Sequence, residues 1–257
     1  MLLEGDNINI DSNLLEFDEL KMYFGESYKV NDYISIHTPS IGEIIDFGEK
    51  EYYSTVYTLT SIPSNRKSEL WDCGIDYETI SDFKFFFIIT RDMTNEKTKL
   101  LLGNLDLSSM TLMQDKTTDL YYMIDINTGA KLDELAYAKI VGYLRKLHNI
   151  TPKVEKAATK TVKKILIELD RQDLKKNKDK PYKSQLKPLI SAMMRYPGFK
   201  YKSNELKEIS IYEFMDTVKG SQIYTNSIAL LQGSYSGMID TSKINKKEFN
   251  WLRDVND

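Results

Sequence analysis

The sequence has 257 residues, with 35 Lys+Arg against 38 Asp+Glu, and a formal net charge of −3. Apolar residues make up 41% and aromatic residues 11%, which excludes a disordered chain and suits one large domain or two modest ones. A single cysteine, Cys73, excludes a disulfide scaffold and a zinc site of several thiolates. No apolar run approaches about 18 residues and the first 31 residues are acidic, so we expect a soluble, cytosol-type protein without a signal peptide.

The charge is uneven along the chain. Residues 1–50 contain 11 acids and 3 bases, whereas residues 151–207 contain 16 bases and 6 acids. Two solvated faces explain this pattern most simply. A second interpretation is an electrostatic dipole that orders copies head to tail, or a basic region that meets an acidic partner or phosphate.

Strand and helix signals alternate in the first 50 residues. The alternation around Ile8–Ile10 is a weak strand signal. Residues 27–37 predict two strands with a turn at Asn31-Asp32. Ser40, followed three residues later by Glu43, predicts a capping box that begins a helix.

Helices and then a sheet are expected up to residue 126. A helical segment over residues 52–62 ends at Pro63, and Ser64 and Ser81 can begin the next two helices. We expect a strand-like zone after them, with a hairpin loop at residues 115–119; its strands are Leu100–Leu102, Leu105–Leu107, Met110–Gln114 and Leu120–Ile126.

From Asp133 onward the apolar period is helical. Seven bases among residues 171–187, with Pro181 in the middle, predict an exposed basic loop. Ser210 with Glu213 predicts a capping box that opens a helix over residues 211–219. Asn245 with Glu248 predicts a terminal helix, which presents Phe249, Trp251 and Leu252.

These signals predict an α+β fold that is mostly α-helical, with a small antiparallel β-sheet. We expect an α+β domain over residues 1–150 and a helical region over residues 151–257 that contains the basic loop 171–187.

Residues suited to catalysis are few. His37 and His148 lie far apart and are expected at a strand end and at a helix end, and Cys73 is expected in packed core. No phosphate-binding glycine loop occurs, and Gly233–Gly237 has Tyr235 where a nucleophile elbow needs Ser, so we expect a turn there. The carboxylates nearest to turns, Asp76, Asp82, Asp106 and Asp125, are expected to cap or turn the backbone. We expect no enzyme activity, no cofactor and no metal.

Two groups of residues are candidates for partner binding. Phe249, Trp251 and Leu252 could anchor a partner, because aromatic residues dominate binding hot spots, or they could dock on the protein's own core. The basic stretch with Tyr182 gives a modest phosphate-contact signal, and a solvated loop is favoured over nucleic-acid binding; its lysines are Lys175, Lys176, Lys178, Lys180 and Lys183.

Three stretches resemble proteins from the structural and assembly genes of tailed bacteriophages that infect Firmicutes, tail assembly chaperones in particular. The first is Tyr28–Ile44 with Phe47–Glu49 and Tyr52-Tyr53, a strand pair that leads into helices. The others are Ile62–Ser64 with Gly74–Phe83, and Phe214–Val218 followed by Gly233, Tyr235–Gly237, Ile244 and Asn250-Trp251.

The resemblance implies a non-enzymatic protein that binds the phage tape-measure protein and recruits tail-tube subunits in the cytoplasm of the infected bacterium. It also implies self-association. Independently of the resemblance, a sequence pI of about 5.6 argues against a nucleic-acid partner, and the lack of a long apolar run argues against a membrane partner. One alternative is a structural virion component, such as a connector or inner protein. Another is a carboxylate- and metal-dependent enzyme acting on nucleic acid, for which a pocket of converging Asp and Glu would be evidence.

Overall fold

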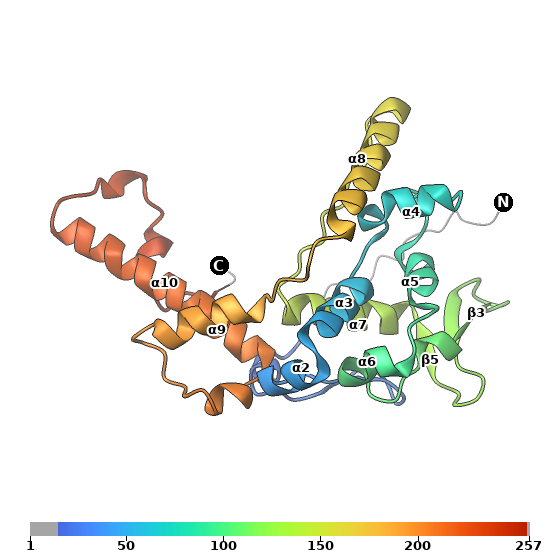
Figure 1. The fold of residues 1–257 in the computed structure, drawn as a ribbon, viewed down its shortest axis with the longest axis horizontal. Helices are drawn as coiled ribbons and strands as arrows, with labels where there is room; N and C mark the ends of the chain where they lie inside the picture. The colour runs from blue at the N-terminus through green and yellow to red at the C-terminus, as the bar shows by residue number, and fades with distance from the viewer. Residues whose placement is uncertain (1–14, 256–257) are drawn as a thin grey trace.

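Helices make up most of the molecule, and the small β-sheets are antiparallel, so the predicted mostly helical α+β class is confirmed. The computed structural model describes residues 15–255, and the strand signal at Ile8–Ile10 lies outside them. In Figure 1 the sheet of β3 to β5 lies at one end of the body. α8 and the distal part of α10 project away from the body.

The described helices and strands follow one another with short connections. The α-helices are α1 (Glu19–Tyr23), α2 (Ile41–Phe47), α3 (Glu49–Leu59), α4 (Lys67–Asp72), α5 (Asp82–Thr90), α6 (Asn95–Leu102), α7 (Glu134–Leu147), α8 (Lys160–Lys178), α9 (Leu186–Arg195) and α10 (Ile211–Tyr235). The strands are β1 (Tyr28–Lys29), β2 (Ser35–Ile36), β3 (Thr111–Gln114), β4 (Tyr121–Ile124) and β5 (Lys131–Asp133). Short 3₁₀ turns include η3 (Leu107–Ser109), η4 (Glu205–Lys207), η5 (Thr241–Lys243) and η6 (Lys246–Phe249).

Local signals near the amino terminus are confirmed. β1 pairs antiparallel with β2, and the side chain of Asn31 accepts hydrogen bonds from the Tyr33 and Ile34 amides at 2.9 and 2.8 Å, which closes the predicted turn. The capping box is present at α2, because Ser40 Oγ accepts from the Glu43 amide and the Glu43 carboxylate accepts from the Ser40 amide.

The strand-like zone divides into helix and sheet. Strands predicted at Leu100–Leu102 and Leu105–Leu107 are wrong, because the first lies in α6 and Leu107 begins η3. Thr98, Leu101 and Leu102 are buried together, at the spacing of one helical face. The hairpin is confirmed: β3 pairs with β4 from Thr111↔Ile124 to Gln114↔Tyr121, and β5 completes the sheet.

The carboxy-terminal third has longer helices than expected. The basic loop predicted over residues 171–187 is wrong for its first half, because α8 continues to Lys178 and only residues 179–185 form a connection. Lysine is a good helix former, and lysines in a last turn complement the helix dipole. α10 likewise runs to Tyr235 instead of ending near Lys219, and the predicted terminal helix is only the 3₁₀ turn η6.

One large hydrophobic core contains residues from both sides of the proposed boundary at residue 150. Ile140 and Leu144 of α7 belong to it, as do Met193 of α9 and Phe214 of α10. The domain boundary stays a prediction.

A backbone bridge joins the two parts of the chain at this core. The Ile41 amide donates to Ile209 O at 3.0 Å, and the Ile211 amide donates to Pro39 O at 2.9 Å. Gly42 lies against this junction: a Cβ there would meet Lys207 O at 2.9 Å. α2 and the segment before α10 therefore approach more closely than a side chain at position 42 allows.

We expect Gly42→Ala to lower the free energy of unfolding by about 1–3 kcal/mol, because the added methyl meets backbone rather than a flexible side chain. Gly220→Ala is the matched control: position 220 is interior to α10 and a Cβ there meets nothing within 4 Å, so a gain of roughly 0.5–1 kcal/mol is expected. Urea unfolding measures both. Equal effects of the two substitutions would contradict the close approach at Gly42.

Candidate protein-interaction site

Few apolar contacts attach α8 to the body. Ile167 is its one buried residue, and it joins a small cluster, separate from the main core, with Leu70 of α4, Tyr77, Ile80 and Phe85. Figure 1 shows α8 rising beside α4 and away from the body. Polar contacts therefore account for much of this attachment.

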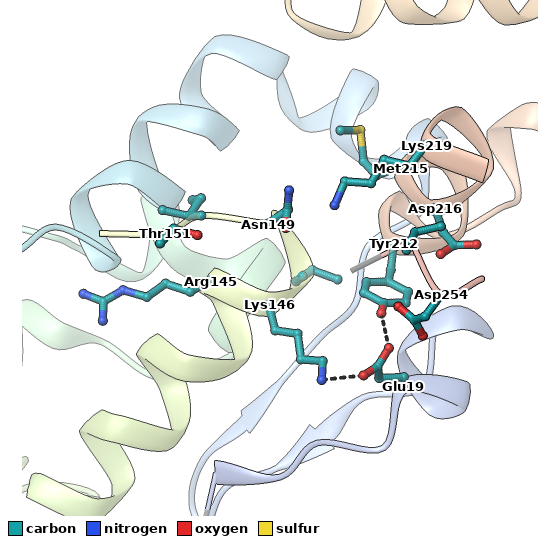
Figure 2. A pocket seen from close by; sticks show the side chains of 13 residues that line it. Glu19, Arg145, Lys146, Asn149, Thr151, Tyr212, Met215, Asp216, Lys219 and Asp254 are labelled. Atoms are coloured by element: carbon teal, nitrogen blue, oxygen red, sulfur yellow. Dashed lines mark hydrogen bonds and ion pairs between the residues drawn. The ribbon is translucent and has the colours of Figure 1, made fainter. Parts of the chain in front are cut away.

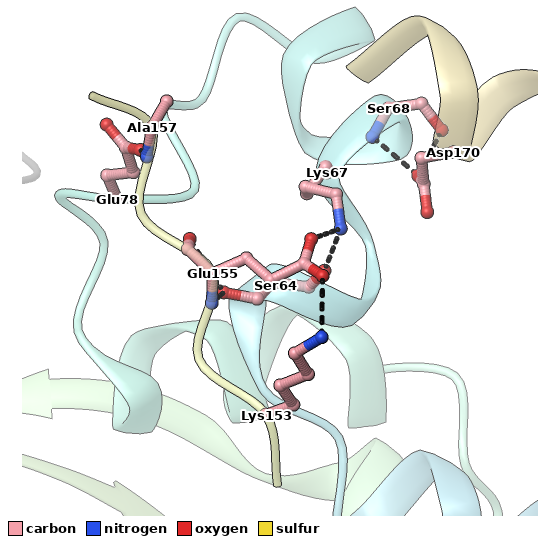
Figure 3. A network of polar contacts seen from close by, with 8 residues as sticks. All are labelled: Ser64, Lys67, Ser68, Glu78, Lys153, Glu155, Ala157 and Asp170. Carbon is pink, nitrogen blue, oxygen red and sulfur yellow. Dashed lines mark hydrogen bonds and ion pairs between the residues drawn. The ribbon is translucent and has the colours of Figure 1, made fainter. Parts of the chain in front are cut away.

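Charged and hydrogen-bonding groups surround Ile167. Lys163 Nζ lies 2.5 Å from Asp76 Oδ1 and 2.8 Å from Glu78 Oε2. Asp170 accepts from the amide and the hydroxyl of Ser68 at 2.9 and 2.7 Å (Figure 3). The Ala157 amide and Lys163 hold the pKa of Glu78 below its usual value, so this carboxylate stays charged at neutral pH.

The segment that leads into α8 is held in the same way. Lys67, a largely buried residue of α4, donates to Glu155 Oε2 at 2.8 Å and to Ser64 O at 2.9 Å. The Glu155 amide donates to Ser64 Oγ at 3.2 Å (Figure 3). We call these contacts the α8 attachment: Lys67–Glu155, Ser68–Asp170 and Lys163 with Asp76 and Glu78. The sequence prediction missed it, although Lys163, Ile167 and Asp170 share one helical face by spacing.

The basic candidates are located at the far end of α8. Lys175, Lys176 and Lys178 lie exposed in its last turn, and Lys180 follows in the connection. Lys180 Nζ donates to Asn177 Oδ1 at 2.8 Å, and Tyr182 is half-exposed. The structure places these lysines on one projecting helix end, and their role in binding stays a prediction.

The aromatic candidates lie on the C-terminal return, residues 236–255, which folds back along α10. Trp251 packs edge to face on Tyr224 of α10, with ring centroids 5.7 Å apart, and Ser227 Oγ donates to Glu248 O at 2.7 Å. Phe249 is partly buried, whereas Trp251 and Leu252 remain 48% and 73% exposed. These side chains are therefore partly docked on the protein itself and partly available.

The return depends on one glycine of the predicted turn. A Cβ at Gly233 would lie 3.2 Å from Ile239, so the return packs closely against α10 at this position. Gly237, with φ +69°, supplies the turn itself, while Gly233–Tyr235 are helical.

The distal part of α10 carries no charge. Its charged residues, Glu213, Asp216 and Lys219, all lie in the first nine positions, and residues 220–235 contain none. Within that stretch only Ser227 is buried. A cavity of about 370 Å³ opens between α9 and α10, lined in part by Leu189, Met193 and Val218. Residues 220–235 of α10 are therefore both largely exposed and uncharged.

A second cavity, of about 360 Å³, lies where α1, α7, α10 and the return meet (Figure 2). Glu19 accepts from Lys146 Nζ at 2.6 Å and from the Tyr212 hydroxyl at 2.7 Å. Burial, and then the nearby carboxylate of Asp254, raise the pKa of Asp216. Glu19 thus ties three helices together, which is a structural role.

The residues considered for catalysis have structural environments. His37 contacts Glu43 at 3.0 Å, and Cys73 is exposed rather than packed in the core, because it ends α4 just before Gly74 turns the chain with φ +73°. Asp106 and Asp125 accept hydrogen bonds from Ser108 and Asn127 amides at 2.9 Å, as turn residues do. Among residues 15–255 no three His, Cys, Asp or Glu side chains gather closely enough to hold a metal ion.

His148 lies at the end of a helix, as expected, but its side chain does not carry the positive charge that would complement the helix dipole. It follows α7, but its ring turns inward, where Nε2 accepts from the Tyr52 hydroxyl at 2.9 Å. Burial lowers the His148 pKa from 6.5 to about 3, so the folded protein keeps this ring neutral.

The chain matches no protein-family model, no curated protein sequence and no solved structure. Of the helices in the described part of the chain, none has the length and apolar character needed to cross a membrane.

We expect His148 to make the protein less stable as the pH falls from 6.5 toward 3, because the unfolded chain then binds a proton that the folded state rejects. The contribution approaches about 1.4 kcal/mol per pH unit. His148→Gln removes this titration, so its stability should fall by roughly 2 kcal/mol less than wild type between pH 7 and pH 5 in urea unfolding. Parallel pH profiles would refute a neutral buried ring.

Lys163→Met should loosen α8, because Asp76 and Glu78 then face each other without their shared cation. A local cost of about 2 kcal/mol corresponds to roughly thirtyfold faster hydrogen exchange in α8. Lys164→Met is the control, since Lys164 is its exposed neighbour. Equal exchange in both variants would show that the ion pairs do not hold the helix.

Proposed function

We propose that this chain is a non-enzymatic assembly protein of a tailed bacteriophage, a tail assembly chaperone that binds the tape-measure protein and recruits tail-tube subunits in the cytoplasm of the infected host. The observation that carries the proposal is the largely exposed arm formed by the uncharged residues 220–235 of α10 together with the C-terminal return. The resemblance of the three sequence stretches supplies the identity of the partners.

An arm of this kind favours protein binding over solvation. A helix on a protein surface normally presents charged residues to water, and residues 220–235 have none. Large apolar side chains are exposed on this stretch and on the return that packs along it: Tyr224, Tyr235, Met238, Trp251 and Leu252 are between 44% and 86% exposed. Exposed apolar surface of this extent is typical of interaction sites.

The chemistry of the arm fits a helical partner. The cavity between α9 and α10 is lined by Leu189, Met193 and Val218 together with short polar side chains, which suits the apolar face of an amphipathic helix. Methionine adapts to different side chains, so successive segments of a long helical protein can be accepted. Trp251 beside this arm offers an aromatic anchor.

The test is recovery of the tagged protein from phage-infected cells, with mass spectrometry of its partners and of purified virions. We expect the tape-measure or tube protein among the partners and the chain absent from virions. Trp251→Ser with Leu252→Ser should reduce recovery at least tenfold, since the loss of one hot-spot tryptophan costs about 2 kcal/mol or more and Leu252 exposes further apolar surface beside it.

Ile126→Ser is the matched control, because Ile126 is equally exposed, at 75%, but lies beside the β-sheet. Stoichiometric presence in virions would replace the chaperone role with that of a structural component. Recovery of neither tail protein, with absence from virions, would refute the phage assignment and leave the carboxylate enzyme to be assayed.

A further inference from the structure

One face of α8 is apolar and unused by the body. Val162, Ile165 and Leu169 are 38%, 53% and 51% exposed, and with Leu166 they form what we call the α8 stripe. Their spacing of three and four residues places them on one side of the helix. The α8 attachment uses a different side, the one that carries Lys163, Ile167 and Asp170.

The charge of α8 limits what can cover this stripe. The helix holds seven bases and three acids. All three acids already have partners, Glu168 with Arg171 at 2.6 Å, Asp170 with Ser68 at 2.7 Å and Asp173 with Lys176 at 3.8 Å. A partner for the stripe must therefore be apolar and surrounded by acidic side chains.

The chain itself presents such a surface on α1. Leu20 and Phe24 are 71% and 74% exposed and, four residues apart, lie on the same side of the chain; we call them the α1 pair. Glu16, Asp18 and Glu26 are exposed next to them in sequence and outnumber the one exposed base of residues 16–26, Lys21.

The α1 pair is rigidly placed. Met22, on the opposite side of α1, is completely buried, and Ser210 Oγ donates to Tyr23 O at 2.8 Å. Glu19 is held by Lys146 and Tyr212 in the cavity of Figure 2. A surface fixed in this way loses little entropy when it binds.

We propose that the α1 pair of one copy packs on the α8 stripe of a second copy. The two surfaces are apolar at the centre and opposite in charge at the rim, which is the arrangement that gives specific association. Because the two patches differ, the contact is heterologous, and repeating it generates an open, head-to-tail array instead of a closed dimer. The short stripe makes each contact weak and reversible.

The purified chain tests this by sedimentation velocity over a series of concentrations. We expect the average mass to rise with concentration at low salt and the apparent association constant to fall at least fivefold from about 50 to about 500 mM NaCl, because exposed charges are then screened. Leu20→Ser with Phe24→Ser, and separately Ile165→Ser with Leu169→Ser, should each give monomers.

Mixing the two double variants distinguishes a head-to-tail contact from a symmetric one. One variant keeps its stripe and the other keeps its pair, so the mixture should form heterodimers and no larger species. Tyr33→Ser with Ile126→Ser is the control: these residues are 62% and 75% exposed and lie outside both surfaces and outside the α10 arm, so their loss should leave association unchanged.

A monomer at every concentration, association that survives both double variants, or a mixture without heterodimers would each overturn the proposal. Circular dichroism of each variant confirms folding, since all four replaced side chains are exposed. No phage partner takes part in this measurement, so its failure is distinct from a failure to recover the tape-measure protein.

Discussion

The positions of three helices, α1, α2 and α10, depend on two serines, Ser40 and Ser210, that face each other in a backbone bridge. Ser40 caps α2 and Ser210 caps α10, and the backbone bridge between them lets Ile41 and Ile211 donate outward to Ile209 and Pro39. The backbone amides at the start of each helix therefore donate hydrogen bonds both to the capping serine of that helix and to a carbonyl of the other segment. Since Ser210 Oγ also donates to Tyr23 O, the same junction fixes α1.

The features that the sequence predicted correctly are those that neighbouring residues decide. The Ser40–Glu43 capping box and the turn at Asn31 use contacts three residues apart, and the β3–β4 hairpin follows from alternation around a short loop. Leu100–Leu102 was ambiguous, because a short apolar run fits a strand as well as a buried helix. The helical face becomes visible only when Thr98, one turn earlier, is counted with Leu101 and Leu102 as a buried residue.

The α8 attachment could not be predicted from local signals. Lys163 and Asp76 are 87 residues apart, and a lysine-rich segment gives the same pattern whether it is a solvated helix or a loop. The same limit applies to His148, because nothing near it in sequence indicates that its ring hydrogen-bonds to the Tyr52 hydroxyl. The candidate residues Phe249, Trp251 and Leu252 follow from the signal at Asn245 and Glu248 and from their aromatic and apolar character. Their packing on α10 could not be predicted in this way, because it requires Gly233 and Ile239 to approach each other.

The separation of contacts along the chain has a consequence for synthesis. The return on α10 joins residues about twenty positions apart, such as Ser227 and Glu248, so it can form as soon as it is translated. The bridge between Ser40 and Ser210 closes a loop of 170 residues. Until the start of α10 leaves the ribosome, the Ile41 amide and the Pro39 carbonyl lack their partners, Ile209 and Ile211. The start of α2 therefore stays incompletely paired during synthesis until the segment around Ser210 emerges.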